Sequence, residues 1–264
     1  MEFSDVKGFV IALVIVAPRL YASLSIAAFL GRRMMTGLLV RNGVILTFAL
    51  FIVPTVHGEI KNITMDWLTL ITIIGKEFII GFLIGYTLNI PFWLGECIGA
   101  FIDNQRGATI ASSMNFLADS FASPLSGLFS QGIMTLFFSS GAFLLFLKGL
   151  FISYVSWPVT SFVPTFETEA MMQFLIAQFS SIVYWTVVLG APVAVAMFLA
   201  EFGFAMVGRF SPSLNVFFIA MPIKSAVSMF MFVLYTGTVI RYFSGEFSGL
   251  DELVNVVFGL IDGK

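Results

Sequence analysis

Charged residues and the side chains of metal chemistry are scarce in this sequence. Only 11% of its 264 residues are charged, whereas an average soluble domain carries about a quarter. The single cysteine, Cys97, and the single histidine, His57, exclude an intrachain disulfide, a Cys/His zinc site and bis-histidine haem ligation for this chain acting alone. The net charge is −2, and the longest basic run is the pair Arg32 and Arg33, so the sequence has no electrostatic footprint for nucleic acid. We therefore expect no metal, no cofactor and no nucleic-acid partner.

Apolar side chains, in contrast, are abundant. Hydrophobic residues make up 59% of the chain, 32 residues are phenylalanine, and the mean hydropathy is +1.01. One soluble core could not bury this much apolar surface, so most of it must face lipid or other apolar protein. We expect an all-α, polytopic membrane protein with residues 1–264 in a single membrane domain. No basic segment precedes the first apolar stretch, and no small-residue cleavage site follows it, so we expect no removable signal peptide.

Six apolar stretches are candidate membrane-spanning helices, because about 20 apolar residues are needed to cross roughly 30 Å of hydrocarbon. They are residues 8–30, 43–56, 67–94, 128–147, 174–200 and 214–240. Most are irregular: the first contains Pro18 and Arg19 at its centre, and the second is short and ends at Pro54. We therefore expect about six hydrophobic helices in irregular hairpins. Lysine and arginine are balanced between the two sides of the membrane, so the sequence leaves the orientation open.

One linker is unusually long and polar. Residues 103–127 are rich in polar and small side chains and separate two apolar stretches. We expect functional residues in a linker of this kind. Asp103 and Arg106 are three residues apart, so they can pair on one helical turn before Gly107 ends the helix. The alternative is a solvated helix end without a functional role.

Several ionisable residues interrupt the apolar stretches. Such groups cost several kcal/mol when they face lipid, so they usually face a protein interface or a wet cavity. They can be structural ties between helices or groups that snorkel to the membrane surface, or they can line a polar lumen or a subunit contact. The set comprises Arg19, Lys76, Glu77, Glu96, Glu201 and Lys224.

Two rows of small residues at a spacing of four are also present. This spacing places side chains on one helical ridge, and small residues there allow two helix backbones to approach closely. Internal helix packing and contacts between subunits are both compatible with the pattern. The rows are Glu77, Gly81, Gly85 and Asn89, and then Gly95, Gly99, Asp103 and Gly107.

The sequence offers little to an enzyme. It contains no P-loop and no Gly-x-Ser-x-Gly elbow. A lone histidine at a helix end, as at His57, is more often a structural residue than a general base. We therefore expect a protein that is not an enzyme.

Two separated motifs resemble a known family. Ile-Asp-Asn-Gln-Arg-Gly-Ala-Thr at residues 102–109 and Arg-Phe-Ser-Pro-Ser-Leu-Asn-Val-Phe at 209–217 are similar to the export-apparatus subunit T family of bacterial type III secretion systems, which has a flagellar counterpart. The resemblance covers nearly the whole chain, including Ala-Pro-Arg at 17–19 and Pro-Phe-Trp at 91–93. The polar form of the first motif favours an injectisome member, and hence a role in virulence, over a flagellar one.

The resemblance implies a function in protein secretion. Members of this family assemble with two smaller subunits, R and S, into a helical, funnel-shaped export gate for unfolded polypeptides. The same resemblance implies contacts with the switch subunit U, with inner rod proteins and with membrane lipid. The expected location is the bacterial inner membrane, crossed several times, with parts of the chain on the periplasmic side. Catalysis by this chain is not implied.

The resemblance also assigns roles to residues. Residues 108–122 match a segment that projects into the closed channel as a plug, with 114–121 at its tip. The expected gate and plug residues are Asp103, Asn104, Gln105, Arg106, Gly107, Met114, Asn115, Phe116 and Leu117. Polar contacts between helices or subunits are expected at Arg19, Lys76, Glu77, Glu201, Arg209, Asn215 and Lys224.

The residues are also compatible with two other functions. A small-solute transporter or channel would need a polar site at the membrane midplane built from broken helices, which Pro18–Arg19 and Lys76–Glu77 could supply. An intramembrane hydrolase using His57 has the least support from the residues present.

Overall fold

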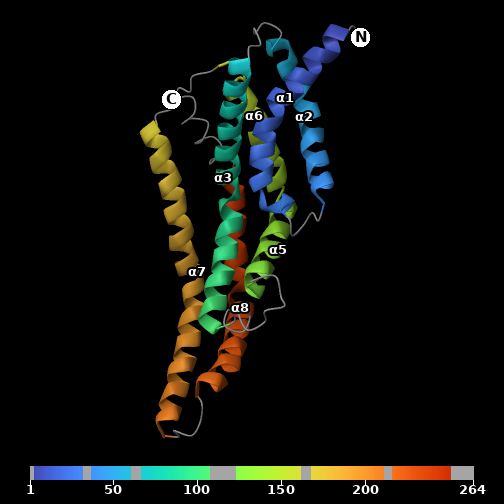
Figure 1. The fold of residues 1–264 in the computed structure, drawn as a ribbon. Helices are drawn as coiled ribbons and strands as arrows, with labels where there is room; N and C mark the ends of the chain where they lie inside the picture. The colour runs from blue at the N-terminus through green and yellow to red at the C-terminus, as the bar shows by residue number, and fades with distance from the viewer. Residues whose placement is uncertain are drawn as a thin grey trace. The chain divides into compact units, whose positions relative to one another are not determined.

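The computed structural model describes residues 3–31, 37–60, 67–107, 123–161, 168–210 and 216–250. In these segments every regular element is a helix, which confirms the all-α prediction (Figure 1). Five of the described helices are long and apolar enough to cross a membrane, or six if the two helices on either side of one break form a single span. The chain is therefore a multi-pass membrane protein.

The elements fall into two compact units. Their order is α1 (Phe3–Ile26), η1 (Ala28–Leu30), α2 (Leu38–Ile60), α3 (Trp67–Arg106), α5 (Pro124–Ser139), α6 (Ala142–Ser156), α7 (Thr168–Phe210) and α8 (Val216–Ser248). Unit 1 comprises Met1–Ile90, Gly141–Ile176 and Gly249–Lys264, and unit 2 comprises Pro91–Ser140 and Ala177–Ser248. Helices α3 and α7 contribute residues to both units.

The prediction of one continuous span over residues 128–147 is wrong. The apolar stretch contains two helices, and α6 continues to Ser156, beyond the end of that stretch. The break lies at Gly141, whose φ of +77° is in the left-handed region that glycine adopts without a steric penalty. Because no charge or proline marks the break, hydropathy alone does not reveal it.

Several other helices are longer than expected. Helix α2 has 23 residues and continues past Pro54, because an internal proline removes only one backbone hydrogen bond and membrane helices tolerate this loss. Helix α3 runs to Arg106 instead of ending near residue 94. As a result, residues 103–106 and 124–127 of the expected polar loop are helical, in the last turn of α3 and the first turn of α5.

In unit 1, the first row of small residues packs α3 against α1, while α1 and α2 lie side by side (Figure 1). A Cβ atom at Gly81 would overlap the backbone carbonyl of Arg19, and one at Gly85 would lie 2.8 Å from Cα of Ser23. Asn89, at the end of the row, accepts a hydrogen bond from the backbone N–H of Ala28 at 2.9 Å and so holds η1. This row therefore serves internal helix packing.

In unit 2, the second row packs α3 against α5. A Cβ atom at Gly99 would collide with the backbone of Leu125 and Ser126, at the start of α5. Phe92 of α3 lies 5.1 Å from Phe137 of α5 and 6.0 Å from Phe247 of α8, measured between ring centroids. Close backbone contact thus allows large aromatic side chains to fill the remaining space.

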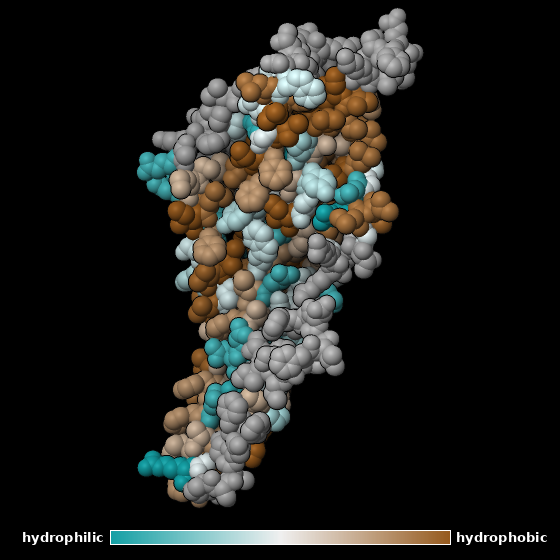
Figure 2. Space-filling view, viewed as in Figure 1, coloured by the Kyte–Doolittle hydropathy of each residue, from teal (hydrophilic) through white to brown (hydrophobic). Residues whose placement is uncertain are grey.

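The outer surface is strongly apolar. Hydrophobic residues cover much of the face in view, with scattered hydrophilic ones (Figure 2). Phe198 on α7 is 64% exposed, and Phe230 and Val233 on α8 are 65% and 73% exposed. Monomeric soluble proteins rarely show extended apolar surface of this kind, so lipid or apolar protein must cover it.

Candidate functional site

A buried ion pair lies at the centre of unit 1. Arg19 of α1 and Glu77 of α3 are both fully buried. The guanidinium Nε donates to Oε2 of Glu77 at 2.7 Å, and Nη2 donates to Oε1 at 2.9 Å. Such a two-point contact is the strongest form of arginine–carboxylate pairing.

Helix α6 and its C-cap residue supply the remaining partners of Arg19. Nη1 donates to the backbone carbonyl of Ser153 at 2.6 Å and to its hydroxyl at 3.1 Å, and Nη2 donates to the carbonyl of Trp157 at 3.0 Å. The ring of Tyr154 lies 4.2 Å from the guanidinium carbon. An arginine has five N–H donors, and here each one has an acceptor. Arg19 therefore ties together α1, α3 and α6.

Lys76 extends this cluster toward the segment after α6. Its Nζ donates to the carbonyls of Pro158, Val159 and Ser161 at 3.0–3.1 Å. It also lies 3.1 Å from Oε1 of Glu77. The sequence identified the ionisable members of the cluster, but it could not predict which backbone carbonyls accept their hydrogen bonds. The N–H donors of Arg19 and Lys76 are bonded to acceptors within the protein. The described cluster is therefore a structural tie between helices, and it offers no solute site of the kind a transporter would need.

A second cluster lies at the end of α3 in unit 2. Arg106 Nη2 lies 2.6 Å from Oδ1 of Asp103, so the ion pair expected from the i, i+3 spacing is present. Gly107 follows with a φ of +80°, as expected for the residue that ends a helix. Asn104 and Gln105 of the same turn are exposed.

Asp103 also binds the start of α5. Its Oδ2 accepts hydrogen bonds from the backbone N–H of Leu125 at 2.9 Å and from the hydroxyl of Ser123. Ser123 is the N-cap of α5, and its hydroxyl accepts from the N–H of Ser126 at 3.2 Å. Sequence reasoning missed Ser123, although a serine followed by a proline is a recognisable helix start. One buried carboxylate thus joins the last turn of α3 to the first turn of α5.

Contacts with α8 complete the second cluster. Arg106 Nη1 donates to the hydroxyl of Ser225 at 3.2 Å. The neighbouring Lys224 donates to Oε2 of Glu201 on α7 at 2.9 Å, and Glu201 is half exposed. Glu96 of α3, one of the ionisable residues in the apolar stretches, accepts from the hydroxyl of Ser130 on α5 at 3.1 Å.

Other expected site residues lie elsewhere. Arg209 is exposed in the last turn of α7, where a positive charge interacts favourably with the helix dipole. The expected tip of the plug and one predicted contact residue lie outside the described residues. These are Met114, Asn115, Phe116, Leu117 and Asn215.

Comparison with known proteins gives one family. A family model described as bacterial export proteins, family 1, matches residues 10–250, a range that contains both charged clusters. The chain is 48% identical over 218 residues to Yop proteins translocation protein T of Yersinia pestis, covering 83% of each chain. It is 31% identical over 195 residues to secretion system apparatus protein SsaT of Salmonella typhimurium, covering 71% of this chain and 72% of the relative. Flagellar biosynthetic protein FliR of Bacillus subtilis is 28% identical over 187 residues, with 70% and 72% covered.

Proposed function

This chain belongs to the bacterial export proteins of family 1, and from that membership we propose that it is a subunit of a type III secretion export gate. In this role it helps to form and close the channel through which unfolded proteins cross the inner membrane. The observation that carries the proposal is the 48% identity to a protein named for Yop translocation, over 83% of both chains. The lower identity of 28% to the flagellar relative favours an injectisome over a flagellum.

The proposed partners are the other subunits of the export apparatus: R and S in the gate, the switch subunit U and the inner rod proteins. Helix α8 supports protein partners. Its 33 residues make a helix of roughly 50 Å, whereas the hydrocarbon core of a bilayer is about 30 Å thick. Only 11% of its apolar window is buried within this chain. Apolar surface of α8 that extends beyond the lipid needs other protein to cover it; the family resemblance is the basis for proposing that part of the chain lies on the periplasmic side.

We place the gate at residues 108–122, with 114–121 as the tip of a plug. The anchoring at Asp103 supports this, because one carboxylate joins the end of α3 to the start of α5. In this proposal the pair of Asp103 and Arg106, together with Gly107, fixes the base of the plug. The bond from Arg106 to Ser225 connects this anchor to α8. In this proposal the whole chain, residues 1–264, acts as one export-gate subunit that conducts polypeptide without catalysing a reaction.

Affinity purification from the native host tests the proposed function. The chain carries a C-terminal tag, is extracted in mild detergent with the secretion genes expressed, and is analysed by native mass and mass spectrometry. We expect two small hydrophobic apparatus subunits in one large complex with this chain. Recovery as a lone monomer or homodimer would contradict the proposal and favour a transporter, which saturable solute uptake in liposomes would then establish.

A further inference from the structure

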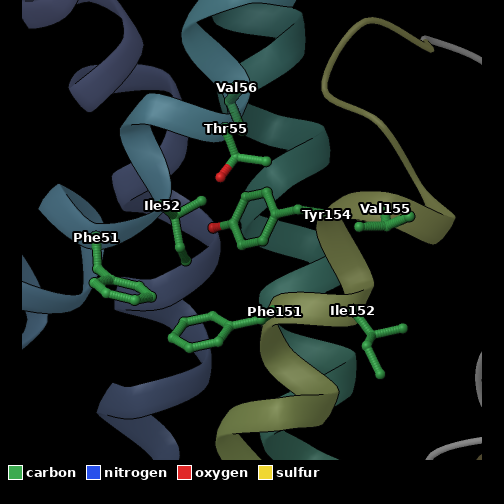
Figure 3. A pocket seen from close by; sticks show the side chains of 8 residues that line it. All are labelled: Phe51, Ile52, Thr55, Val56, Phe151, Ile152, Tyr154 and Val155. Carbon is green, nitrogen blue, oxygen red and sulfur yellow. The ribbon is translucent and has the colours of Figure 1, made fainter.

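Two arginines among the described residues are buried, and they differ in how completely they are bonded. In unit 1, each N–H donor of Arg19 has an acceptor. The ring of Tyr154, which Figure 3 shows extending from α6 toward Ile52 and Thr55 of α2, lies 4.2 Å from its guanidinium carbon. An arginine held in this way is a fixed tie between helices.

Arg106, at the end of α3 in unit 2, is only 9% exposed but is bonded much less completely. Its Nη2 pairs with Oδ1 of Asp103 on the same helix, and its Nη1 donates to the hydroxyl of Ser225 on α8 at 3.2 Å. Its Nε is buried and has no hydrogen-bond partner among the described residues. Buried polar groups without a partner are rare in folded proteins, and each one calls for an explanation. The guanidinium thus contacts α8 through one neutral acceptor and retains an unused donor.

Ser225 lies on a firmly packed part of α8. The hydroxyl of Ser228, which is fully buried, donates to the backbone carbonyl of Ser225 at 3.1 Å. One turn further along α8, the ring of Phe232 lies 5.2 Å from that of Phe129 on α5, measured between centroids. These contacts hold this part of α8 against its neighbours, so Ser225 presents its hydroxyl to Arg106 from a fixed position.

The end of α3 lies beside the same face of α8 at a second point. A Cβ atom at Gly107 would lie 3.7 Å from Cε of Met221, which is an ordinary van der Waals distance. Met221 precedes Ser225 by four residues, so both lie on one ridge of α8. A methionine side chain is flexible and makes no strong directional bond. The direction of the Arg106 side chain toward α8 therefore depends on the hydroxyl of Ser225.

We propose that Ser225 is the latch of the export gate: its hydroxyl holds Arg106 against α8 in the closed state, and this bond breaks when the gate opens. The inference rests on the proposed gate function, because the proposed plug begins directly after Gly107. A single bond to a neutral hydroxyl is weaker than a two-point pair with a carboxylate, such as that of Arg19. A latch of this strength keeps the gate closed at rest and still allows it to open.

Two substitutions of Ser225 with opposite expected effects test the latch. Ser225→Ala removes the bond to Arg106, so we expect a several-fold increase in the ion conductance of the assembled complex in planar bilayers. Ser225→Asp offers Arg106 a carboxylate, so we expect a several-fold slower export of a secreted protein in the host, without increased conductance. Ala226→Asp is the matched control, because it adds the same charge at the next residue, which is exposed. This control should change neither the conductance nor the export rate.

The direction of the effects separates a latch from a merely structural serine. If Ser225 only contributed to packing, both of its substitutions would loosen the end of α3, so increased conductance in both would overturn the latch. Deletion of residues 114–121, measured in the same bilayers, tests the gate function separately. If the deletion raises the conductance and Ser225→Ala does not, the latch is wrong and the gate function stands. If the deletion leaves the conductance of an intact complex unchanged, the gate function is contradicted, and the latch with it.

Discussion

The buried pair of Arg19 and Glu77 permits a quantitative prediction. Glu77→Gln keeps the shape of the side chain and removes its charge, so Arg19 stays fully buried without a counter-ion. Breaking a buried ion pair by removing one partner costs about 3–5 kcal/mol. The neighbouring Lys76 adds to the cost, because it also loses its contact with the carboxylate at 3.1 Å.

Glu201→Gln is the matched control. Glu201 pairs with Lys224 at a similar distance, 2.9 Å, but its side chain is 51% exposed. The Lys224 side chain is 12% exposed, so this half-open pair should contribute more than the roughly 0–1 kcal/mol of an exposed pair and less than a fully buried one. The same substitution at the two positions therefore separates the effect of burial from the effect of the amide itself.

The assay is heat-induced loss of the folded chain in detergent, followed by size-exclusion chromatography of the soluble fraction. We expect a much lower midpoint temperature for Glu77→Gln than for the wild type, and a smaller decrease for Glu201→Gln. Because the ion pairs of Glu77 among the described residues are with Arg19 and Lys76 of its own unit, any loss of assembly with other subunits should follow this loss of stability. Equal midpoint temperatures for Glu77→Gln and Glu201→Gln would refute the argument that burial makes the Arg19–Glu77 pair the stronger tie.

Three further predictions concern packing and the gate. Gly81→Ala should lower the midpoint temperature, because the new Cβ clashes with the Arg19 carbonyl, whereas Gly237→Ala, with no atom within 4 Å of the new Cβ, should leave it unchanged or raise it. Equal effects of the two substitutions would contradict the packing described for α1 and α3. Ser123→Ala removes the α5 cap and one partner of Asp103, which should cost about 1 kcal/mol of stability. This variant should raise ion leakage through the assembled gate in planar bilayers, whereas Ser139→Ala, at an exposed serine, should not. Deleting residues 114–121 should increase the same conductance more strongly, and an unchanged conductance in a complex shown to be intact would rule out the plug.

Local spacing in the sequence was sufficient for several features. The Asp103–Arg106 pair follows from a spacing of three residues, which places both side chains on one helical turn. Gly107 ends the helix because glycine readily adopts a positive φ. The composition predicted the all-α membrane class, because so much apolar surface has no place in a soluble fold. Each of these properties depends on neighbouring residues or on the sum of all residues.

The tertiary structure alone decided which groups meet. Arg19 and Glu77 are 58 residues apart, and the carbonyl of Ser153 lies 134 residues from Arg19 in the chain. Backbone carbonyls are identical in every sequence, so only the packing of α6 shows that they complete the coordination of Arg19. The rows of glycine indicated close helix contacts but left the partner open, and the fold assigned them to α1 and α5 within the same chain. Side-chain type and local spacing determine what a residue can bind, whereas the path of the chain through space determines what is near enough to be bound.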